Sequence, residues 1–242
     1  MTRKKGPSVL VLSAASGAGH VKAAEALVAA CTSHGIPARH VEVLKYTNKV
    51  FRKLYSDTYI DLVNRQPDLL GWGYNLLDHP WRFQKTKLAL DLLNAGPLVR
   101  FLAREKPDIV VCTHFLPAEI LLHLREKKLL DVPMSIVITD YDAHALWLFQ
   151  GVDFYFVACE ETRVYLEAVG IPAGTIHVTG IPVDPRFGLT TDRRAARREL
   201  GLDPKKTTIL VSAGGFGVGP MEAIVRRRPL RLAPHPGSRD LR

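Results

Sequence analysis

The sequence predicts an α/β protein built on a doubly wound parallel sheet, in a Rossmann-like arrangement. Short, largely apolar runs such as residues 8–13 (SVLVLS) and 134–139 (MSIVIT) are typical of strands buried on both faces. Segments with helical spacing alternate with these runs, which indicates parallel strands joined by crossover helices. A glycine-rich turn follows the first run, at the carboxyl end of a strand, where such sheets bind their ligands.

The first strand, helix and second strand occupy residues 8–44. Small and apolar residues recur at helical spacing between residues 21 and 34, until Gly35 and Pro37 end the helix. Residues 39–44 (RHVEVL) alternate as a second strand. A long helical stretch between residues 46 and 104 then interrupts the pattern, and an insertion of that length usually has a function of its own.

The alternation resumes after the insertion and completes one Rossmann-like domain, residues 1–180. Each expected strand is a short apolar run, and each expected helix ends near a glycine or a basic residue. We expect strands at residues 108–112, 134–139, 154–157 and 176–178, and helices at residues 116–127 and 160–169.

Three further parts follow this domain. Residues 181–206 form a linker rich in proline and charge, with a short helix at 192–199. Residues 207–225 begin a second Rossmann-like unit with a strand (TTILVS, 207–212), a glycine loop and a helix start at Met221, and the unit is not finished. The arginine- and proline-rich residues 226–242 cannot continue an amphipathic helix, so we expect a disordered tail and a broken reading frame or gene near Val225.

The positive charge of the chain is concentrated in that tail. The formal net charge is +9, and residues 226–242 hold six arginines and one aspartate, which leaves +4 for everything before them. The body is therefore only mildly basic, and its charge does not by itself indicate a nucleic acid partner.

Three widely spaced cysteines indicate reduced thiols in a cytosolic protein without a metal site. No run approaches the roughly 18 apolar residues of a spanning helix, so any membrane contact is expected to be peripheral.

The turn at residues 16–20 (SGAGH) is the first candidate site. Gly17 and Gly19 allow close approach of the backbone to a ligand, and the following helix N-terminus suits a phosphate. His20 falls in the first helical turn, where the helix dipole lowers the pKa of the imidazole and favours the neutral form that accepts a proton. The alternatives are a tight turn that merely needs small residues and a histidine that only caps or packs.

Two nucleotide-binding motifs do not fit this turn. The P-loop requires a Lys followed by Ser or Thr directly after its last glycine, whereas Lys22 comes three residues after Gly19 without either. The dinucleotide fingerprint requires a glycine where Lys22 stands. Both mismatches count against a kinase, an ATPase or a dehydrogenase.

Four blocks of the sequence occur in a recognisable order: SAASGAGHVKAAEAL (13–27), PDIVVCTHFLP (107–117), PMSIVITDYDAHALW (133–147) and VTGIPVDPRF (178–187). Together they resemble one known family, the monogalactosyldiacylglycerol synthases and processive diacylglycerol glucosyltransferases. The resemblance covers nearly all of residues 7–222 and implies a GT-B glycosyltransferase, with two Rossmann-like domains. It implies that the first domain binds the lipid acceptor and that the second binds the UDP-sugar. The UDP-sugar serves as co-substrate, and no other cofactor is implied. The resemblance also implies that His20 is the base on the diacylglycerol hydroxyl.

Polar residues after the run at 134–139 form the second candidate site, where a doubly wound sheet places its ligands. Asp140 is a candidate to orient an imidazole or bind a hydroxyl, and His144 and Trp147 are candidates to line the acceptor pocket. The resemblance favours these roles. The alternative is that Asp140 caps the following helix and Trp147 packs in the core. His114, after the run at 108–112, is a weaker candidate of the same kind.

Two other segments point to the lipid and the donor. Residues 46–87 mix aromatic and basic side chains, a composition that suits an anionic bilayer surface, single-stranded nucleic acid or an ordinary helical core. The resemblance favours the lipid and no nucleic acid. Gly214, Gly215 and Gly217 repeat the first glycine turn, and the resemblance implies that this loop approaches the diphosphate of the donor.

Together these features predict an inverting glycosyltransferase that moves glucose or galactose from UDP to diacylglycerol at the inner, cytoplasmic face of the membrane, as a peripheral protein. Because the second unit is unfinished, we expect the chain as given to be impaired in transfer. The alternatives are a noncatalytic lipid-binding fragment and a related transferase acting on another lipid-linked acceptor, such as a peptidoglycan precursor.

Overall fold

The computed structural model describes residues 7–14, 17–47, 78, 96–189, 192–212 and 221–226 of the 242-residue chain. The chain divides into two compact units, Met1–Pro185 and Arg186–Arg242. The first unit contains the sheet and the two candidate sites around His20 and Asp140. The division between units falls inside the predicted linker, whose boundaries stay a prediction.

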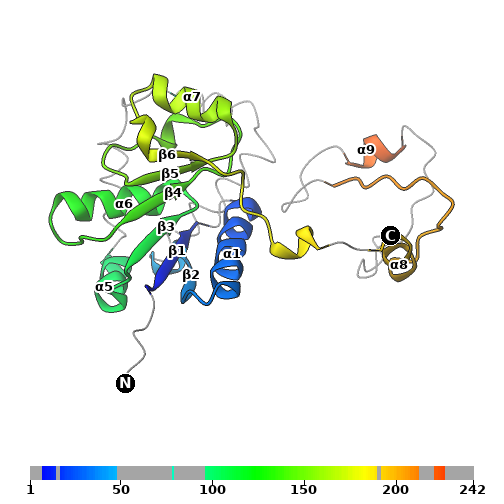
Figure 1. Cartoon of the computed structure of the whole chain (residues 1–242), viewed down its shortest axis with the longest axis horizontal. Coiled ribbons are helices and arrows are strands. Elements are labelled where there is room, and N and C mark those ends of the chain that lie inside the picture. Colours follow the sequence, from blue (N-terminus) through cyan, green and yellow to red (C-terminus); the bar gives the residue numbers. More distant parts are fainter. Residues whose placement is uncertain are drawn as a thin grey trace. The chain divides into compact units, whose positions relative to one another are not determined.

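Unit 1 is built on a six-stranded sheet in which every pairing is parallel (Figure 1). The strand order is β2-β1-β3-β4-β5-β6, so the chain moves from β1 to one edge, returns to β3 and then moves to the other edge. This reversal confirms the predicted doubly wound sheet and places its switch point between β1 and β3. The strands are β1 (Val9–Ser13), β2 (Ala38–Glu42), β3 (Ile109–Cys112), β4 (Met134–Val137), β5 (Phe154–Val157) and β6 (Ile176–Val178).

Helices cover both faces of this sheet. Figure 1 shows α1 on one face of the sheet and α5 and α6 on the other, as expected where the strand order reverses. α1 packs on β1 and β2, α6 on β3 and β4, and α7 on β5 and β6. The helices are α1 (Ala18–Ser33), α5 (Gly96–Glu105), α6 (Phe115–Glu126) and α7 (Glu160–Ala168).

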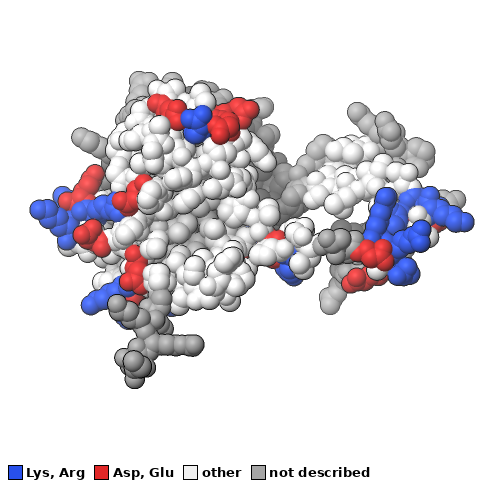
Figure 2. Space-filling view, in the orientation of Figure 1, with Lys and Arg blue, Asp and Glu red and all other residues white. Residues whose placement is uncertain are grey.

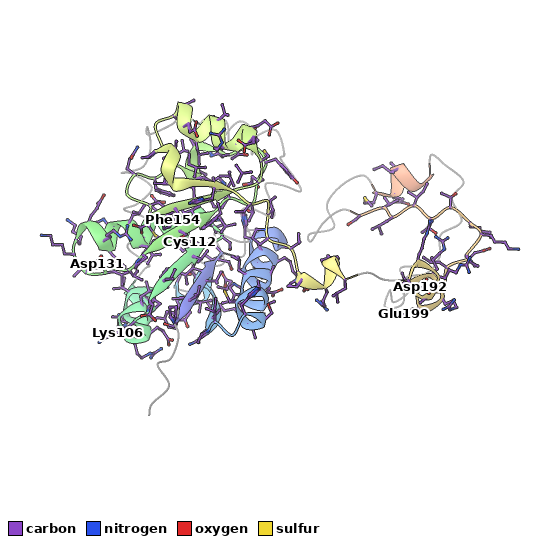
Figure 3. All side chains as sticks on the ribbon, viewed as in Figure 1. Lys106, Cys112, Asp131, Phe154, Asp192 and Glu199 are labelled. Carbon is purple, nitrogen blue, oxygen red and sulfur yellow. The ribbon has the colours of Figure 1, made fainter. Side chains whose placement is uncertain are left out.

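The main core lies between the sheet and the helices α5, α6 and α7. Alternate strand residues such as Leu12, Cys112 and Ile136 point into it and are completely buried; Cys112, at the end of β3, is labelled in Figure 3. On the opposite face, α1 buries only the small side chains of Ala23, Ala24 and Ala26. Small side chains allow a helix to approach a sheet closely, so the first turn of α1 lies directly against the carboxyl end of β1.

Two strands end two residues earlier than predicted. The predicted strand at 39–44 ends at Glu42, because a 3₁₀ helix at Val43–Tyr46 follows, whose Leu44 amide donates to the Glu42 side chain at 3.0 Å. The predicted strand at 134–139 ends at Val137. Thr139 and Asp140 therefore belong to the loop after β4, where their side chains are available to the candidate site.

The described part of unit 2 contains two short helices, α8 (Arg193–Glu199) and α9 (Met221–Arg226). Asp192 begins α8 by accepting a hydrogen bond from the Arg194 amide at 2.9 Å (Figure 3). Basic side chains gather on α8, as Figure 2 shows. A 3₁₀ helix at Pro185–Gly188 lies at the division between the units.

Residues 207–212, predicted as a strand, are not in a strand, whereas the helix start predicted at Met221 is confirmed by α9. That residues 207–225 begin a second Rossmann-like unit stays a prediction. A β-strand exists only through its pairing, and no segment among the described residues of unit 2 pairs with this one. Leu210 is consequently 88% exposed. The loop with Gly214, Gly215 and Gly217, the tail after Arg226 and most of the insertion at 46–87 lie outside the described residues.

No helix in the described part of the chain is both long enough and apolar enough to cross a bilayer. Within that part, no group of three or more His, Cys, Asp or Glu side chains is arranged to hold a metal ion. Cys31, Cys112 and Cys159 are free cysteines.

Removing the Tyr155 hydroxyl tests the packing beneath the candidate site. This hydroxyl accepts from the Phe149 amide at 2.9 Å and lies within hydrogen-bond distance of the Phe149 and Trp147 carbonyl oxygens. Because Tyr155 is buried, Tyr155→Phe leaves these backbone groups without a partner and should lower the free energy of unfolding by about 1–3 kcal/mol. Urea denaturation followed by circular dichroism measures it. Tyr165→Phe, a partly buried control, should change stability by less than about 0.5 kcal/mol, and an equal effect of both variants would contradict the prediction.

Candidate active site at the carboxyl ends of β1, β3 and β4

The glycine turn leads from β1 directly into α1. Gly17 is the N-cap residue of α1, and its φ of 168° and ψ of 150° describe extended backbone that any residue adopts. A β-carbon on Gly17 would lie 3.8 Å from Cδ2 of His20, and one on Gly19 would meet nothing within 4 Å. Neither glycine is therefore required by local sterics. Gly17 and Gly19 add no side chain to the start of α1, and Gly17 lies beside the Cδ2 edge of the His20 ring. Ser16 lies outside the described residues.

His20 lies where three strand ends meet. Its Nδ1 is 3.0 Å from the main-chain oxygen of Thr113, directly after β3, and 2.8 Å from Oγ1 of Thr139, after β4. Thr113 Oγ1 in turn donates to the main-chain oxygen of His20 at 2.9 Å. The imidazole is thus held at the switch point of the sheet, by residues 93 and 119 positions away in the sequence.

Aromatic rings form the wall behind this imidazole. The His114 ring meets the His20 ring edge-on, with centroids 4.7 Å apart and an interplanar angle of 84°, and the Trp147 ring lies 5.9 Å from it. Phe115 packs against both His114 and Trp147. These rings exclude water from one side of His20, whereas the glycine turn lies on another.

This environment lowers the pKa of His20 below the usual 6.5. Burial is the largest cause because it disfavours the charged ring, while the Asp140 carboxylate and the Thr113 carbonyl act in the opposite direction. The direction agrees with the expectation from sequence, but burial replaces the helix dipole as its main origin. His20 is consequently neutral at pH 7, which is the form that accepts a proton.

Asp140 and Trp147 are brought together by a hydrogen bond. The indole Nε1 of Trp147 donates to Asp140 Oδ2 at 2.9 Å, and Trp147 is only 1% exposed. Asp140 therefore does not cap a helix, and it acts on His20 through its charge. Trp147 packs in the wall behind His20, and its role in acceptor binding stays a prediction.

His144 stabilises the turn that carries Trp147. It is 4% exposed and begins the 3₁₀ helix at Ala145–Trp147, where its Nδ1 accepts from the Leu146 amide at 3.0 Å. Its Nε2 lies 3.8 Å from Asp78 Oδ1, which also accepts from the Ala145 amide at 2.8 Å. The structure thus places His144 in a structural position, and direct contact with the acceptor stays a prediction.

His114 has the equivalent position at α6. Its Nδ1 accepts from the Leu116 amide at 3.0 Å, and its side chain is buried against His20. The sequence pattern contains no signal that singles out Thr113, Thr139 or Asp78, because each follows or lies within a segment of ordinary composition. Only the order of the strands brings the two threonines to His20.

Comparison with known proteins shows which family and which relatives this chain is similar to. The family model for monogalactosyldiacylglycerol (MGDG) synthase matches residues 20–183. Processive diacylglycerol beta-glucosyltransferases of Staphylococcus aureus strains MRSA252 and JH9 are each 27% identical over 219 residues, with 87% of this chain and 53% of the relative covered. The chain therefore spans about half the length of these curated relatives.

Two solved structures give weaker matches. The apo form of the lipopolysaccharide outer core galactosyltransferase WaaB aligns with a TM-score of 0.42 and 16% identity, over 71% of this chain and 44% of that one. MurG of Acinetobacter baumannii aligns with a TM-score of 0.40 and 17% identity, over 72% and 45%. The family model, by contrast, matches well over half of the chain and includes His20, Thr113, Thr139, Asp140 and Trp147. The chain belongs to the monogalactosyldiacylglycerol synthase family.

Proposed function

We propose that this chain supplies the acceptor side of a glycosyltransferase that moves a hexose from a UDP-sugar to diacylglycerol. The observation that carries the proposal is His20, a neutral imidazole at the switch point of a parallel sheet, with one ring edge toward a glycine turn. The family model and the names of the relatives supply the lipid acceptor and the sugar.

The arrangement suits an inverting displacement. His20 removes the proton from the diacylglycerol hydroxyl, the oxygen forms a bond to the anomeric carbon, and the bond from that carbon to the UDP oxygen breaks. The leaving diphosphate carries the negative charge away. The N-terminus of α1, where Gly17 and Gly19 carry no side chain and no acidic residue stands in the first turn, is suited to meet part of that charge. We assign the same role to Gly214, Gly215 and Gly217, as the resemblance implies.

The location follows from the substrate. Diacylglycerol resides in membranes, and the described residues contain no helix able to span one. We therefore propose peripheral attachment to the inner face of an anionic membrane, with the aromatic and basic side chains of residues 46–87 as the contact. The donor is UDP-glucose or UDP-galactose, which the names of the relatives and of the family model respectively favour.

Acceptor binding is tested with the chain itself. Short-chain diacylglycerol is titrated in detergent micelles into ¹⁵N-labelled protein, and amide resonances are followed. We expect the shifts to concentrate at residues 17–20 and 139–141, with micelles lacking diacylglycerol as the control. If resonances at these residues do not respond to diacylglycerol, the proposed acceptor site is wrong.

Transfer is tested in a hybrid, because the chain spans about half of its relatives. Residues 1–185, a compact unit, replace the corresponding part of the Staphylococcus aureus glucosyltransferase, and radiolabelled UDP-glucose or UDP-galactose is supplied with diacylglycerol liposomes. We expect a labelled glycolipid that depends on diacylglycerol. A hybrid that binds diacylglycerol and UDP but transfers no sugar would instead support a noncatalytic lipid-binding role.

Substitution of Gly17 tests access to the imidazole. Gly17→Val should leave the melting temperature nearly unchanged, since its extended backbone accepts any residue and a β-carbon would make only an ordinary contact at 3.8 Å. The branched side chain should nevertheless cover the Cδ2 edge of His20 and lower transfer by about tenfold or more. Gly174→Val, at a glycine where a β-carbon would meet nothing within 4 Å, is the control and should leave transfer unchanged. Full activity of Gly17→Val would show that the acceptor approaches from elsewhere.

A further inference from the structure

Both groups that contact His20 Nδ1 bear on which ring nitrogen holds the proton. The Thr113 oxygen, 3.0 Å from Nδ1, is a carbonyl and can only accept a hydrogen bond. A neutral imidazole that makes this bond must carry its proton on Nδ1. The Thr139 hydroxyl, 2.8 Å from the same nitrogen, then accepts from that proton as well and keeps its own hydrogen for another partner.

The opposite nitrogen, Nε2, is left with its lone pair. Among the described residues no group forms a hydrogen bond with Nε2 of His20. Cδ2, the ring carbon bonded to Nε2, is the atom that faces the bare α-carbon of Gly17. The nitrogen able to accept a proton therefore lies on the ring edge that faces the glycine turn.

We propose that Thr139 is a positioning residue for the base: its hydroxyl and the Thr113 carbonyl hold the His20 proton on Nδ1, so that Nε2 takes the proton of the acceptor hydroxyl. This inference rests on the proposed role of His20 in transfer. Free neutral histidine prefers to carry its proton on Nε2, so the protein has to stabilise the other tautomer. Two acceptors from different strand ends do so and also fix the rotation of the ring.

In many histidine–carboxylate pairs a carboxylate holds the proton on one ring nitrogen, and Asp140 is the carboxylate nearest in role here. Its Oδ2 instead accepts from Trp147 Nε1 at 2.9 Å. Its negative charge still favours the imidazolium that forms when Nε2 gains the proton of the acceptor. The two functions are thus divided: the threonines select the nitrogen, and the carboxylate stabilises the charged product.

The tautomer is measured directly by long-range ¹H–¹⁵N correlation spectra of the labelled chain. Protonated and unprotonated ring nitrogens differ widely in ¹⁵N shift, and at about pH 7.5 His20 is neutral because its pKa lies below 6.5. We expect a protonated Nδ1 in the wild-type chain. Thr139→Val, which keeps the shape of the side chain, should raise the Nε2-protonated fraction several-fold, and Thr139→Ser should restore the wild-type spectrum.

Controls separate positioning from folding. Unchanged amide spectra outside the site show that each variant folds, and Thr175→Val, the same exchange at a partly buried threonine in another part of unit 1, should leave the His20 tautomer unaltered. A wild-type His20 protonated on Nε2 would overturn the inference, and so would a Thr139→Val spectrum identical to that of the wild type.

The transfer assay of the hybrid supplies a second readout. Thr139→Val should lower kcat by about tenfold, with little change in KM for diacylglycerol, and Thr139→Ser should restore most of the rate. A rise in KM with kcat unchanged would assign Thr139 to acceptor binding and overturn the positioning role. The tautomer measurement needs neither donor nor acceptor. Absence of transfer in the wild-type hybrid therefore counts against the proposed function alone.

Discussion

Replacing His20 with alanine is expected to lower kcat for hexose transfer by about 10²–10⁴-fold, the range over which a positioned general base contributes to a rate. The variant removes the partly buried, neutral imidazole whose Cδ2 edge faces the glycine turn. The affinity for diacylglycerol should change little, because the base acts on the hydroxyl proton in the transition state. Transfer of radiolabel by the hybrid measures both quantities.

A matched control lies at the other end of the same helix. His34 follows α1 and is exposed, so His34→Ala should leave transfer unchanged. Equal rates of wild type and His20→Ala would remove His20 as the base, and a tenfold increase in KM with an unchanged kcat would make it a binding residue.

The pH dependence has a definite sign. Burial lowers the pKa of His20 below 6.5, and only the neutral ring is a base, so the transfer rate should rise with pH through that pKa and level off above it. The same shift means that the unfolded chain takes up this proton more readily than the folded one. Its contribution to stability is therefore present above 6.5 and lost as the pH falls through the pKa of the folded state. A rate that falls as pH rises through this range would mean that the imidazolium is the active form.

Most strands of unit 1 were predictable because burial on both faces leaves a continuous apolar run. The end of β4 shows where this signal stops being informative. Residues 138 and 139 extend the apolar run, and the Ile138 amide still donates to the Phe156 oxygen, yet Thr139 leaves the strand and turns its hydroxyl to His20. Hydrophobic pattern reports burial, and it does not report where pairing ends.

The converse case is the segment at 207–212, which has the composition of a strand. Its pattern is as strong as that of β1, but a strand is a property of two segments, and the described residues supply no partner. A single sequence window therefore predicts the capacity for pairing, and the tertiary structure decides whether the pairing occurs.

The sequence predicted which residues of the candidate site lie at strand ends, but it did not predict which side chains contact one another there. His20 and Asp140 follow strands of the predicted sheet, and their positions at carboxyl ends were inferred correctly from that alone. The Thr139 contact joins residues 119 positions apart, so it depends on β1, β3 and β4 being neighbours. The hydrogen bond between Trp147 and Asp140 depends on the conformation of the loop after β4, which no periodicity encodes.

Trp147→Ala is expected to have the largest effect on folding, a loss of about 3–5 kcal/mol in the free energy of unfolding. The indole is 1% exposed, packs against His20 and Phe115, and is the donor to Asp140. Such a loss is a large part of the stability of a typical domain. Urea denaturation followed by far-ultraviolet circular dichroism measures it. Trp147→Phe keeps an aromatic ring but removes the N–H, so it should lose only about 1–2 kcal/mol.

The same variant distinguishes the two roles considered for Trp147. A side chain that packs in the wall behind His20 loses stability on truncation, and the diacylglycerol affinity of the folded fraction changes little. Truncation of a side chain that lines the acceptor pocket should instead lower the affinity for diacylglycerol and lower the free energy of unfolding by less than about 1 kcal/mol. Because Trp147 also holds the carboxylate that favours protonated His20, both substitutions should leave Asp140 without its indole donor. A shift in the measured pKa of His20 in Trp147→Phe would then show that the wall tunes the base as well as shielding it from water.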